Sequence, residues 1–239
     1  MEQHQVLATV IRHLAAAVSL VVLAGCSAGP TGDAPNLTAT LSTPVDAELS
    51  WRVADKAAAG QVVEYSNAEN GPYTILEFLP LSRTTYKHED LIPQTKFFYR
   101  VRPYYGTASP SVELTLPPGE FEESKEFQEW LLPSTRPGPP AHASVRDARG
   151  APTDFTVTMV NPNGVKLTWT DHTTDEEGFL VEIKPDGAPG FSLAAMVDPN
   201  VNTYGLVTQP TEKKATYRVR PYRFGEPTTI AALTTGGNL

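Results

Sequence analysis

The sequence is poor in the residues that most often carry chemistry. It contains one cysteine, Cys26, and five histidines among 239 residues. A single thiol cannot form a disulfide within the chain or a thiolate zinc site, so any core must hold by packing alone. Nucleophile elbows of the Gly-x-Ser-x-Gly type, His-Glu-x-x-His helices and glycine-rich phosphate loops are also absent from the sequence. We therefore predict that the protein is not an enzyme and holds no cofactor.

Positive charge is scarce as well. The chain has 19 lysines and arginines against 27 aspartates and glutamates, which gives a formal net charge of -8 at pH 7. Binding to nucleic acid requires a concentrated basic face, and this balance argues against one. Acidity of this size mainly implies solubility and mild repulsion from other acidic surfaces. We expect no nucleic acid among the partners.

A short apolar run lies near the N-terminus, between Leu14 and Leu23. It is too short to span a bilayer and follows a weakly basic start, which is typical of a secretory signal peptide. We predict that residues 1–25 are a signal peptide. Residues 26–34 are small and polar, so we expect them to form a short tether.

The end of this run, Leu23-Ala24-Gly25-Cys26, resembles the lipobox of bacterial lipoproteins. The resemblance implies that Cys26 becomes the lipidated first residue of the mature chain and anchors it to a membrane. The next residue, Ser27, is not the aspartate that this family associates with retention at the inner membrane. The expected location is therefore the cell envelope, at the outer membrane or cell surface. The alternative is an unlipidated secreted protein with a stray thiol.

One six-residue stretch occurs twice. Tyr99-Arg100-Val101-Arg102-Pro103-Tyr104 returns 118 residues later, at positions 217–222. The same offset aligns Trp51 with Trp169 and needs no gap from Leu49 onward. A repeat that keeps its register over this length indicates one supersecondary plan used twice.

Both repeats consist of short runs with alternating apolar residues, separated by turn residues about every eight to twelve positions. This pattern is typical of a β-sandwich. We predict an all-β chain of two tandem immunoglobulin-like sandwiches, one over residues 35–117 and one over residues 152–236. Val112 and Leu114 alternate as the expected last strand of the first sandwich.

The first repeat also resembles the fibronectin type III family. That family has a core tryptophan on its second strand and a Leu-x-Pro-x-Thr-x-Tyr corner, which correspond here to Trp51 and to residues 91–97. Phe97 stands where the family has tyrosine, so the corner must close by burial of a ring. Residues 165–182 resemble the corresponding region of bacterial members of the family. The second corner departs further, at Gln209, Thr211 and Ala215.

The segment between the repeats, residues 118–151, matches neither of them. Phe127, Trp130 and Leu131 have the spacing of one helical face, which predicts a short helix. Such a helix either packs its rings on a neighbouring sandwich or presents them to a partner. The proline-rich stretch 136–140 is expected to be a semi-rigid spacer.

Charged residues on the strands give the first candidate site. Glu64 and Glu182 are expected to point outward beside arginines of the neighbouring strand. These residues form either an exposed cross-strand ion ladder or a patch that binds an anion or a protein. The candidate patch consists of Arg100, Arg102, Tyr104, Arg218, Arg220 and Tyr222.

A second, weaker candidate is a group of carboxylates in one loop of the second repeat. Grouped carboxylates can bind calcium, which takes six to eight oxygen ligands. No glycine-centred twelve-residue loop accompanies them, so we expect no metal site beyond this weak calcium candidate. The residues are Asp171, Asp175, Glu176 and Glu177.

Together these features predict an exported, lipid-anchored binding or spacer module on a bacterial cell envelope. The expected partners are the membrane, through lipidated Cys26, and an unknown envelope protein or polysaccharide. One alternative is a carbohydrate-associated accessory module, which the resemblance implies because the family often accompanies polysaccharide-degrading enzymes. The other alternative is a structural stalk without a ligand.

Overall fold

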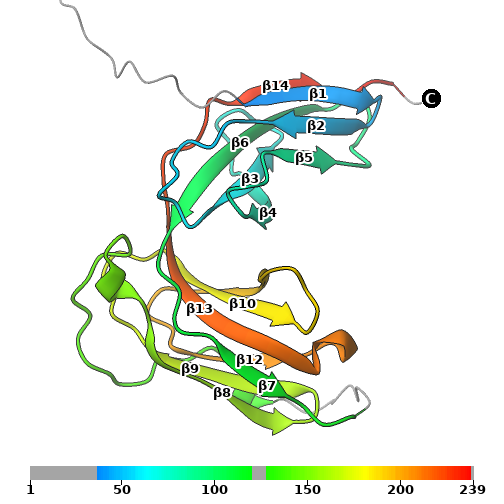
Figure 1. The fold of residues 1–239 in the computed structure, drawn as a ribbon. Coiled ribbons are helices and arrows are strands. Elements are labelled where there is room, and N and C mark those ends of the chain that lie inside the picture. The colour runs from blue at the N-terminus through cyan, green and yellow to red at the C-terminus, as the bar shows by residue number, and fades with distance from the viewer. Residues whose placement is uncertain (1–36, 120–127, 238–239) are drawn as a thin grey trace, which may run out of the picture. The chain divides into compact units, whose positions relative to one another are not determined.

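The computed structural model describes residues 37–119 and 128–237. The predicted signal peptide, the tether with Cys26, and Phe127 lie outside the described residues. Within the described ranges the chain is all-β, with fourteen strands and three 3₁₀ turns of three residues each (Figure 1). The all-β prediction is confirmed.

The first sandwich packs a three-stranded sheet against one part of an eight-stranded sheet. The small sheet has the order β1 (Thr38–Thr43), β2 (Asp46–Ser50), β5 (Thr85–His88). The facing strands are β4 (Thr74–Leu79), β3 (Gly60–Ser66) and β6 (Lys96–Tyr105). Trp51 lies in the core between the two sheets and is only 6% exposed, as predicted.

The second sandwich follows the same plan. Its small sheet has the order β12 (Thr203–Val207), β9 (Gly164–Thr170), β8 (Thr153–Asn161). The facing strands are β11 (Ser192–Val197), β10 (Gly178–Pro185) and β13 (Lys214–Phe224). Trp169 is buried here beside Phe179, and their ring centroids are 5.4 Å apart.

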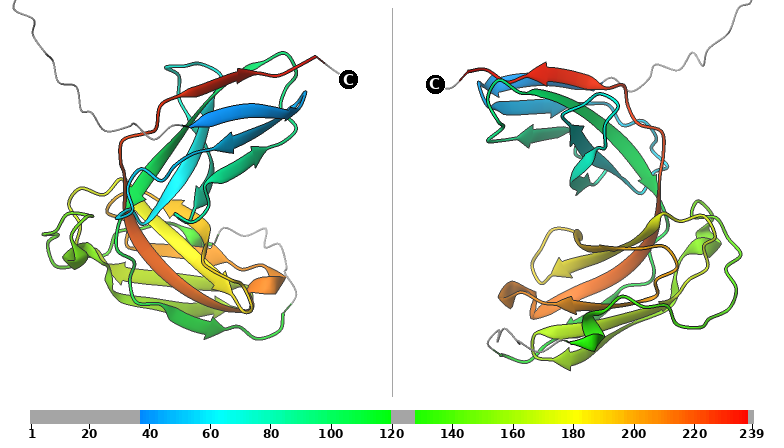
Figure 2. Two further views of the ribbon diagram at one scale, coloured as in Figure 1. Left: turned by 45° about the horizontal axis from the view of Figure 1, so that its top comes forward. Right: turned by 180° about the vertical axis from the view of Figure 1, so that it is seen from behind.

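The last strand of each repeat belongs to the other sandwich. β7 (Val112–Thr115) pairs antiparallel with β13, and β14 (Ala231–Thr234) pairs antiparallel with β6. In Figure 1 the green β7 lies beside β13, and the red β14 lies beside the blue β1; Figure 2 shows both placements from two further sides. We call β7 and β14 the exchanged strands.

The expectation that Val112 and Leu114 close the first sandwich was therefore wrong. Both side chains pack on the second core, while Ala231 and Leu233 pack on the first. The two exchanged strands carry similar alternating patterns, and both receiving strands come from the repeated stretch around Tyr99 and its counterpart. Alternation determines which side chains face a core, but it does not determine which core.

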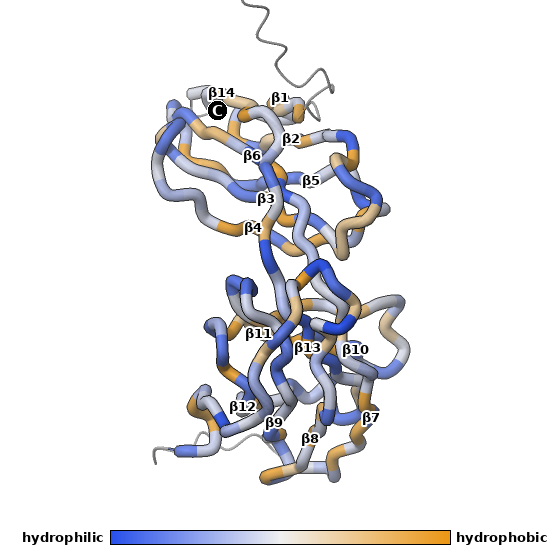
Figure 3. Tube along the Cα trace, turned by 90° about the vertical axis from the view of Figure 1, so that its left-hand side faces the viewer, coloured by the Kyte–Doolittle hydropathy of each residue, from blue (hydrophilic) through white to orange (hydrophobic). Residues whose placement is uncertain are grey.

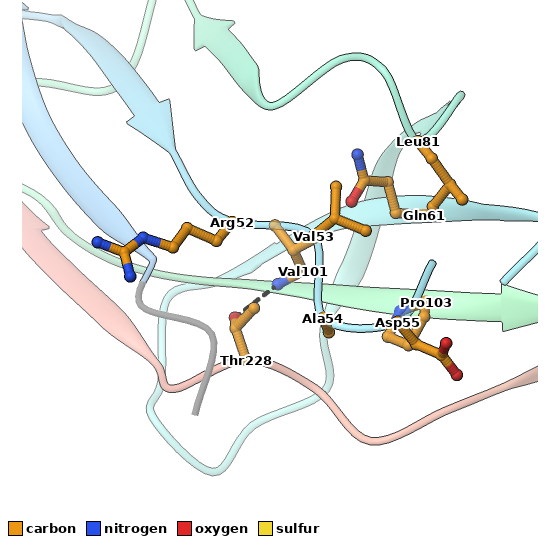
Figure 4. A pocket seen from close by; sticks show the side chains of 9 residues that line it. All are labelled: Arg52, Val53, Ala54, Asp55, Gln61, Leu81, Val101, Pro103 and Thr228. Atoms are coloured by element: carbon orange, nitrogen blue, oxygen red, sulfur yellow. Dashed lines mark hydrogen bonds between the residues drawn. The ribbon is translucent and has the colours of Figure 1, made fainter. Parts of the chain in front are cut away.

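The chain crosses from one sandwich to the other twice, between β6 and β7 and between β13 and β14. A serine or threonine holds each crossing segment in place. Ser109 donates its backbone N–H to the carbonyl of Val219 (2.8 Å), and its Oγ accepts from the Val219 N–H (3.1 Å). Thr228 does the same with Val101, at 2.8 Å and 3.0 Å. Figure 4 shows this second pair beside a cavity of about 10 Å³, about enough for one water molecule. The two crossings thus use the same hydrogen-bond pattern.

Gly106 begins the first crossing, and its position in the structure admits only glycine. Its φ is +143°, a region that side chains rarely adopt, and a Cβ there would collide with the carbonyl of Pro221. Beside this point β6 and β13 pair directly, with Tyr105 opposite Arg223 and Tyr104 opposite Phe224. The eight-stranded sheet is therefore continuous through both sandwiches.

The two corners close differently. Phe97 is buried, as predicted, and Thr235, the residue after β14, adds a second contact. Its hydroxyl donates to the carbonyl of Ile92 (2.7 Å), and the Thr95 carbonyl lies within 3.1 Å as a second acceptor. The second corner forms a 3₁₀ turn, Pro210–Glu212, closed by a capping box in which Gln209 and Glu212 bond reciprocally. The residue types that depart from the family pattern therefore support a different local structure.

The segment between the repeats packs on the second sandwich. Its 3₁₀ turn Glu129–Leu131 places Trp130 against Gly164 and Gly205, where any Cβ would collide with it. Trp130 therefore packs on a neighbouring sandwich, the first of the two predicted arrangements.

The proline-rich stretch is held at its start. The Ser134 N–H donates to the Thr203 carbonyl at 3.0 Å, and Arg136 exchanges two hydrogen bonds with the Asn202 side chain. Further on, a 3₁₀ turn at Ala148–Gly150 leads into β8. The stretch is thus fastened to the second sandwich, and the prediction of a spacer applies only to its exposed middle.

Hydrophobic residues are spread along the strands of both sandwiches and do not form one long run (Figure 3). Over residues 37–119 and 128–237, no helix has the length and apolar character needed to cross a bilayer.

Candidate functional site

The six residues of the candidate patch lie on β6 and β13. Most of their side chains make contacts inside the protein and are not directed at solvent. Arg100 Nε lies 2.6 Å from Glu64 Oε2, and its guanidinium stacks 3.9 Å from the centroid of Tyr73. In the second repeat the equivalent trio is Arg218, Glu182 and Phe191, with distances of 2.7 Å and 3.9 Å.

The glutamates of these trios are buried, which corrects the expectation of an exposed ion ladder. Glu64 is 3% exposed and Glu182 is 8% exposed. They do point away from the sandwich cores, but the arginines cover them. An aromatic ring from the loop before the edge strand lies over each trio's arginine. A buried carboxylate is costly unless it is paired, so these ion pairs are structural elements.

The second arginine of each repeat reaches across to the other repeat. Arg102 Nε donates to the carbonyl of Gly225 (3.2 Å), and its guanidinium lies 4.5 Å from the centroid of Phe224. Arg220 donates to the carbonyl of Gly106 (2.7 Å) and also contacts Glu182 at 3.3 Å. Each side chain therefore holds the start of the crossing that leaves the other repeat.

The two tyrosines of the candidate patch are buried where β6 meets β13. Tyr104 and Tyr222 pack with Leu180, and both rings lie in T-shaped geometry to Phe78, at 5.4 Å and 6.4 Å between centroids. Burial raises the pKa of both phenols. Neither ring forms an exposed frame around the arginines.

The four candidate calcium ligands are each engaged in loop structure. Asp171 accepts from the backbone and hydroxyl of Thr173, both at 2.9 Å. Asp175 accepts from the Val145 N–H (2.7 Å) and from a serine hydroxyl. Glu176 accepts from the Asn200 N–H at 3.3 Å, and Glu177 accepts from the Phe224 N–H at 3.2 Å. Among the described residues no group of acidic, histidine or cysteine side chains is arranged to hold a metal ion.

None of the three histidines in the described part of the chain forms an ion pair with a carboxylate. His172 Nε2 lies 2.8 Å from the hydroxyl of Thr153, and its ring contacts that of His142 edge-on at 5.4 Å. His88 is half-buried in the first core, where its Nδ1 lies 3.2 Å from the Tyr99 hydroxyl. Burial lowers the pKa of His88 and so favours its neutral form.

One solvent-facing cleft lies beside the arginines of the second repeat. Its volume is about 510 Å³, and Gly106, Thr107 and Ala108 of the first crossing form one wall. Arg218 and Arg220 line it, together with Arg146 from the segment between the repeats. We call it the arginine cleft. Arg146 was missed from the sequence because it has no counterpart in the repeat.

No protein-family model and no curated protein matches the chain. Among solved structures it is similar to an Fn3-like protein from Clostridium thermocellum, at 29% identity over 29% of this chain and 73% of that one. It is also similar to a two-domain fibronectin type III segment of chicken tenascin, at 16% identity over 85% of this chain and 100% of that one. A third similar structure is the fn3 domain of human collagen alpha-1(XX), at 27% identity over 33% and 77%.

The TM-score is 0.27 in each of these comparisons. These neighbours are fibronectin type III domain proteins. The fold follows from its own strand order and its two buried cores.

Proposed function

We propose that the protein is an exported, lipid-anchored binding or spacer module on a bacterial cell envelope. The observation that supports the spacer or binding role is the strand exchange, since each sandwich contains a strand from the other repeat. The two sandwiches cannot separate without breaking these ladders and the direct β6–β13 pairs. A linked pair of this kind is suited to holding a surface at a distance from its anchor.

The anchor in this proposal is Cys26, on the strength of the lipobox resemblance. Cells producing the wild-type chain and a Cys26→Ser variant would be labelled with radioactive palmitate. Label in the wild type alone, together with release of the variant from the membrane fraction, is the expected result. Equal labelling of the two proteins would refute the anchor.

A stalk without a ligand is the second candidate. It is favoured by the engagement of the patch arginines with Glu64, Glu182 and backbone carbonyls. Pull-down from envelope extracts separates the two candidates when wild type is compared with Arg146→Ala, which alters the arginine cleft without touching either buried glutamate. Loss of one specific protein or polysaccharide from the variant supports a binding module. Recovery of no partner by either protein supports the stalk.

A further inference from the structure

The arginine cleft has an unusual charge for this acidic chain. Its charged lining side chains are three arginines, and no carboxylate lines it. Three carboxylates are bonded to lining residues without lining the cleft themselves: Glu182 pairs with Arg218 and Arg220, Asp55 accepts from the Tyr105 hydroxyl at 2.8 Å, and Asp175 accepts from the Val145 N–H at 2.7 Å. Each of these carboxylates is already engaged, so the charges on the lining of the cleft itself are those of the arginines.

The three guanidinium groups differ in how exposed they are and in how many of their N–H groups are already bonded within the protein. Arg220 is largely buried and is engaged by Glu182 and the Gly106 carbonyl. Arg218 is about a quarter exposed and directs Nε and Nη2 at Glu182. Arg146 is exposed, and none of the ion pairs formed by the described residues includes it. Arg146 is thus the cation most available to a ligand.

Arg146 is also held in place. Its guanidinium carbon lies 3.3 Å from the ring centroid of Tyr105. The neighbouring Val145 is buried against the same ring, and its N–H is fixed by Asp175 at 2.7 Å. Stacking on an aromatic face limits the motion of a guanidinium. The same group also acts on the Tyr105 hydroxyl, and its charge helps to lower the pKa of Asp55. The cation is therefore positioned before any ligand arrives.

We propose that the arginine cleft binds an oxyanion, a carboxylate or phosphate group, with Arg146 as the principal contact. Planar guanidinium groups match the geometry of such anions and bind them through charge-assisted hydrogen bonds. Arg218 and Arg220 contribute mainly by the positive potential they give to the wall. This inference specifies the ligand chemistry of the binding role proposed above and rests on that role for its biological meaning.

The corresponding positions of the first repeat are arranged differently. The counterpart of Arg220 is Arg102, whose guanidinium lies on Phe224, and no residue of the first repeat corresponds to Arg146. The segment between the repeats supplies that residue to one side only. We therefore expect one oxyanion site per chain.

In the test, the purified full chain in detergent is titrated with inorganic phosphate and, separately, with acetate. The readout is the chemical shift of the amide NMR signals of Tyr105 and Val145. Saturable shifts with at least one of the two anions are expected. Arg146→Ala should weaken binding about tenfold or more, because it removes a hydrogen bond between charged groups. The affinity of Arg146→Lys should lie between those of the wild type and Arg146→Ala, since lysine keeps the positive charge but lacks the planar guanidinium group.

Arg136→Ala is the matched control. Arg136 is an exposed arginine of the same segment outside the cleft, and it bonds to Asn202 through its backbone N–H and carbonyl. Its removal changes the net charge equally, so binding should stay at the wild-type level. Absence of saturable shifts with both anions, or equal weakening in the Arg136 and Arg146 variants, would overturn the proposal.

A further arm identifies the source of the anion. Binding of a polyuronate chain that depends on Arg146, with weak binding of acetate, would indicate an anionic group on a polymer. Saturation by phosphate alone at low concentration would indicate a small free ion. Both outcomes support the site. The titration is independent of lipidation, so a negative palmitate result would refute the anchor and leave the cleft untouched.

Discussion

The two repeats form the same core, but the buried polar atoms of its aromatic side chains are hydrogen-bonded only in the first repeat. In the first, Trp51 Nε1 donates to Gln61 Oε1 at 2.9 Å, and the Tyr99 hydroxyl lies 3.2 Å from His88 Nδ1. In the second, the aligned partner positions hold Phe179 and Leu206. Among the described residues, Trp169 Nε1 and the Tyr217 hydroxyl have no hydrogen-bond partner.

The difference shows what the repeated plan requires. A buried donor left without a partner costs about 1–3 kcal/mol, and an aromatic contact returns about 0.5–1.5 kcal/mol. The second repeat has the contact between Trp169 and Phe179 in place of the hydrogen bond. Both repeats nevertheless form the same sandwich, so the plan depends on the burial of these rings and tolerates the loss of their polar partners.

The largest expected effect compares the two buried glutamates. Glu182 contacts two arginines and Glu64 contacts one. Glu182→Gln should lower the free energy of unfolding by about 3 kcal/mol, because it leaves two cations beside a neutral amide. Glu64→Gln should cost less. Urea denaturation measures both, with the exposed pair partner Glu77→Gln as control, expected to cost under about 1 kcal/mol. Equal costs for Glu182 and Glu77 would contradict the structural role.

A second pair of changes tests the strand exchange. Leu233→Ala should weaken the first sandwich and Leu114→Ala the second, each by about 2 kcal/mol, the low end for truncation of a leucine that is only partly buried. Hydrogen exchange of the amides in β3 and β9 reports the two cores separately. If each leucine protected the repeat that contains it in sequence, the exchanged pairing would be wrong.

A third pair sharpens the comparison of the tryptophans. Trp51→Phe removes packing and also leaves the Gln61 amide oxygen without its donor, whereas Trp169→Phe removes packing and an unpaired N–H. We expect the first change to lower the free energy of unfolding by about 1 kcal/mol more than the second. Thermal unfolding of both variants measures the difference. If Trp169→Phe lowered the free energy of unfolding more than Trp51→Phe, the difference in stability would be due to packing and not to the hydrogen bond with Gln61.

The smallest expected effect is on pH dependence. Burial holds the pKa of His88 below its ordinary value of 6.5, so the unfolded chain takes up a proton more readily than the folded one. The contribution of His88 to stability is therefore complete above pH 6.5 and is lost as the pH falls toward the folded-state pKa. His88→Leu, which copies Leu206, should remove this part of the acid sensitivity. Denaturation curves at pH 7.5 and 5.5 provide the measurement, and an unchanged difference would exclude His88 as the cause.

Much of the fold could be predicted from the sequence. The repeat of Tyr99–Tyr104 and the alignment of Trp51 with Trp169 identified strands and core positions, because burial leaves an alternating pattern. The placement of β7 and β14 could not be predicted, since two similar sheet edges accept either strand. The burial of Glu64 was missed because the ring over its arginine comes from Tyr73, outside the paired strands. Arg146 was missed because only the folded chain brings it to the repeat.

The placement of β14 has a consequence for how the protein is made. A ribosome delivers the chain from its N-terminus, yet the sheet edge at Tyr99 is completed only by Ala231, almost at the C-terminus. Closing such distant segments is slow, and the N-terminal half must wait for the last residues to be synthesised. The sheet of the first sandwich therefore stays one strand short until the whole second repeat has been made.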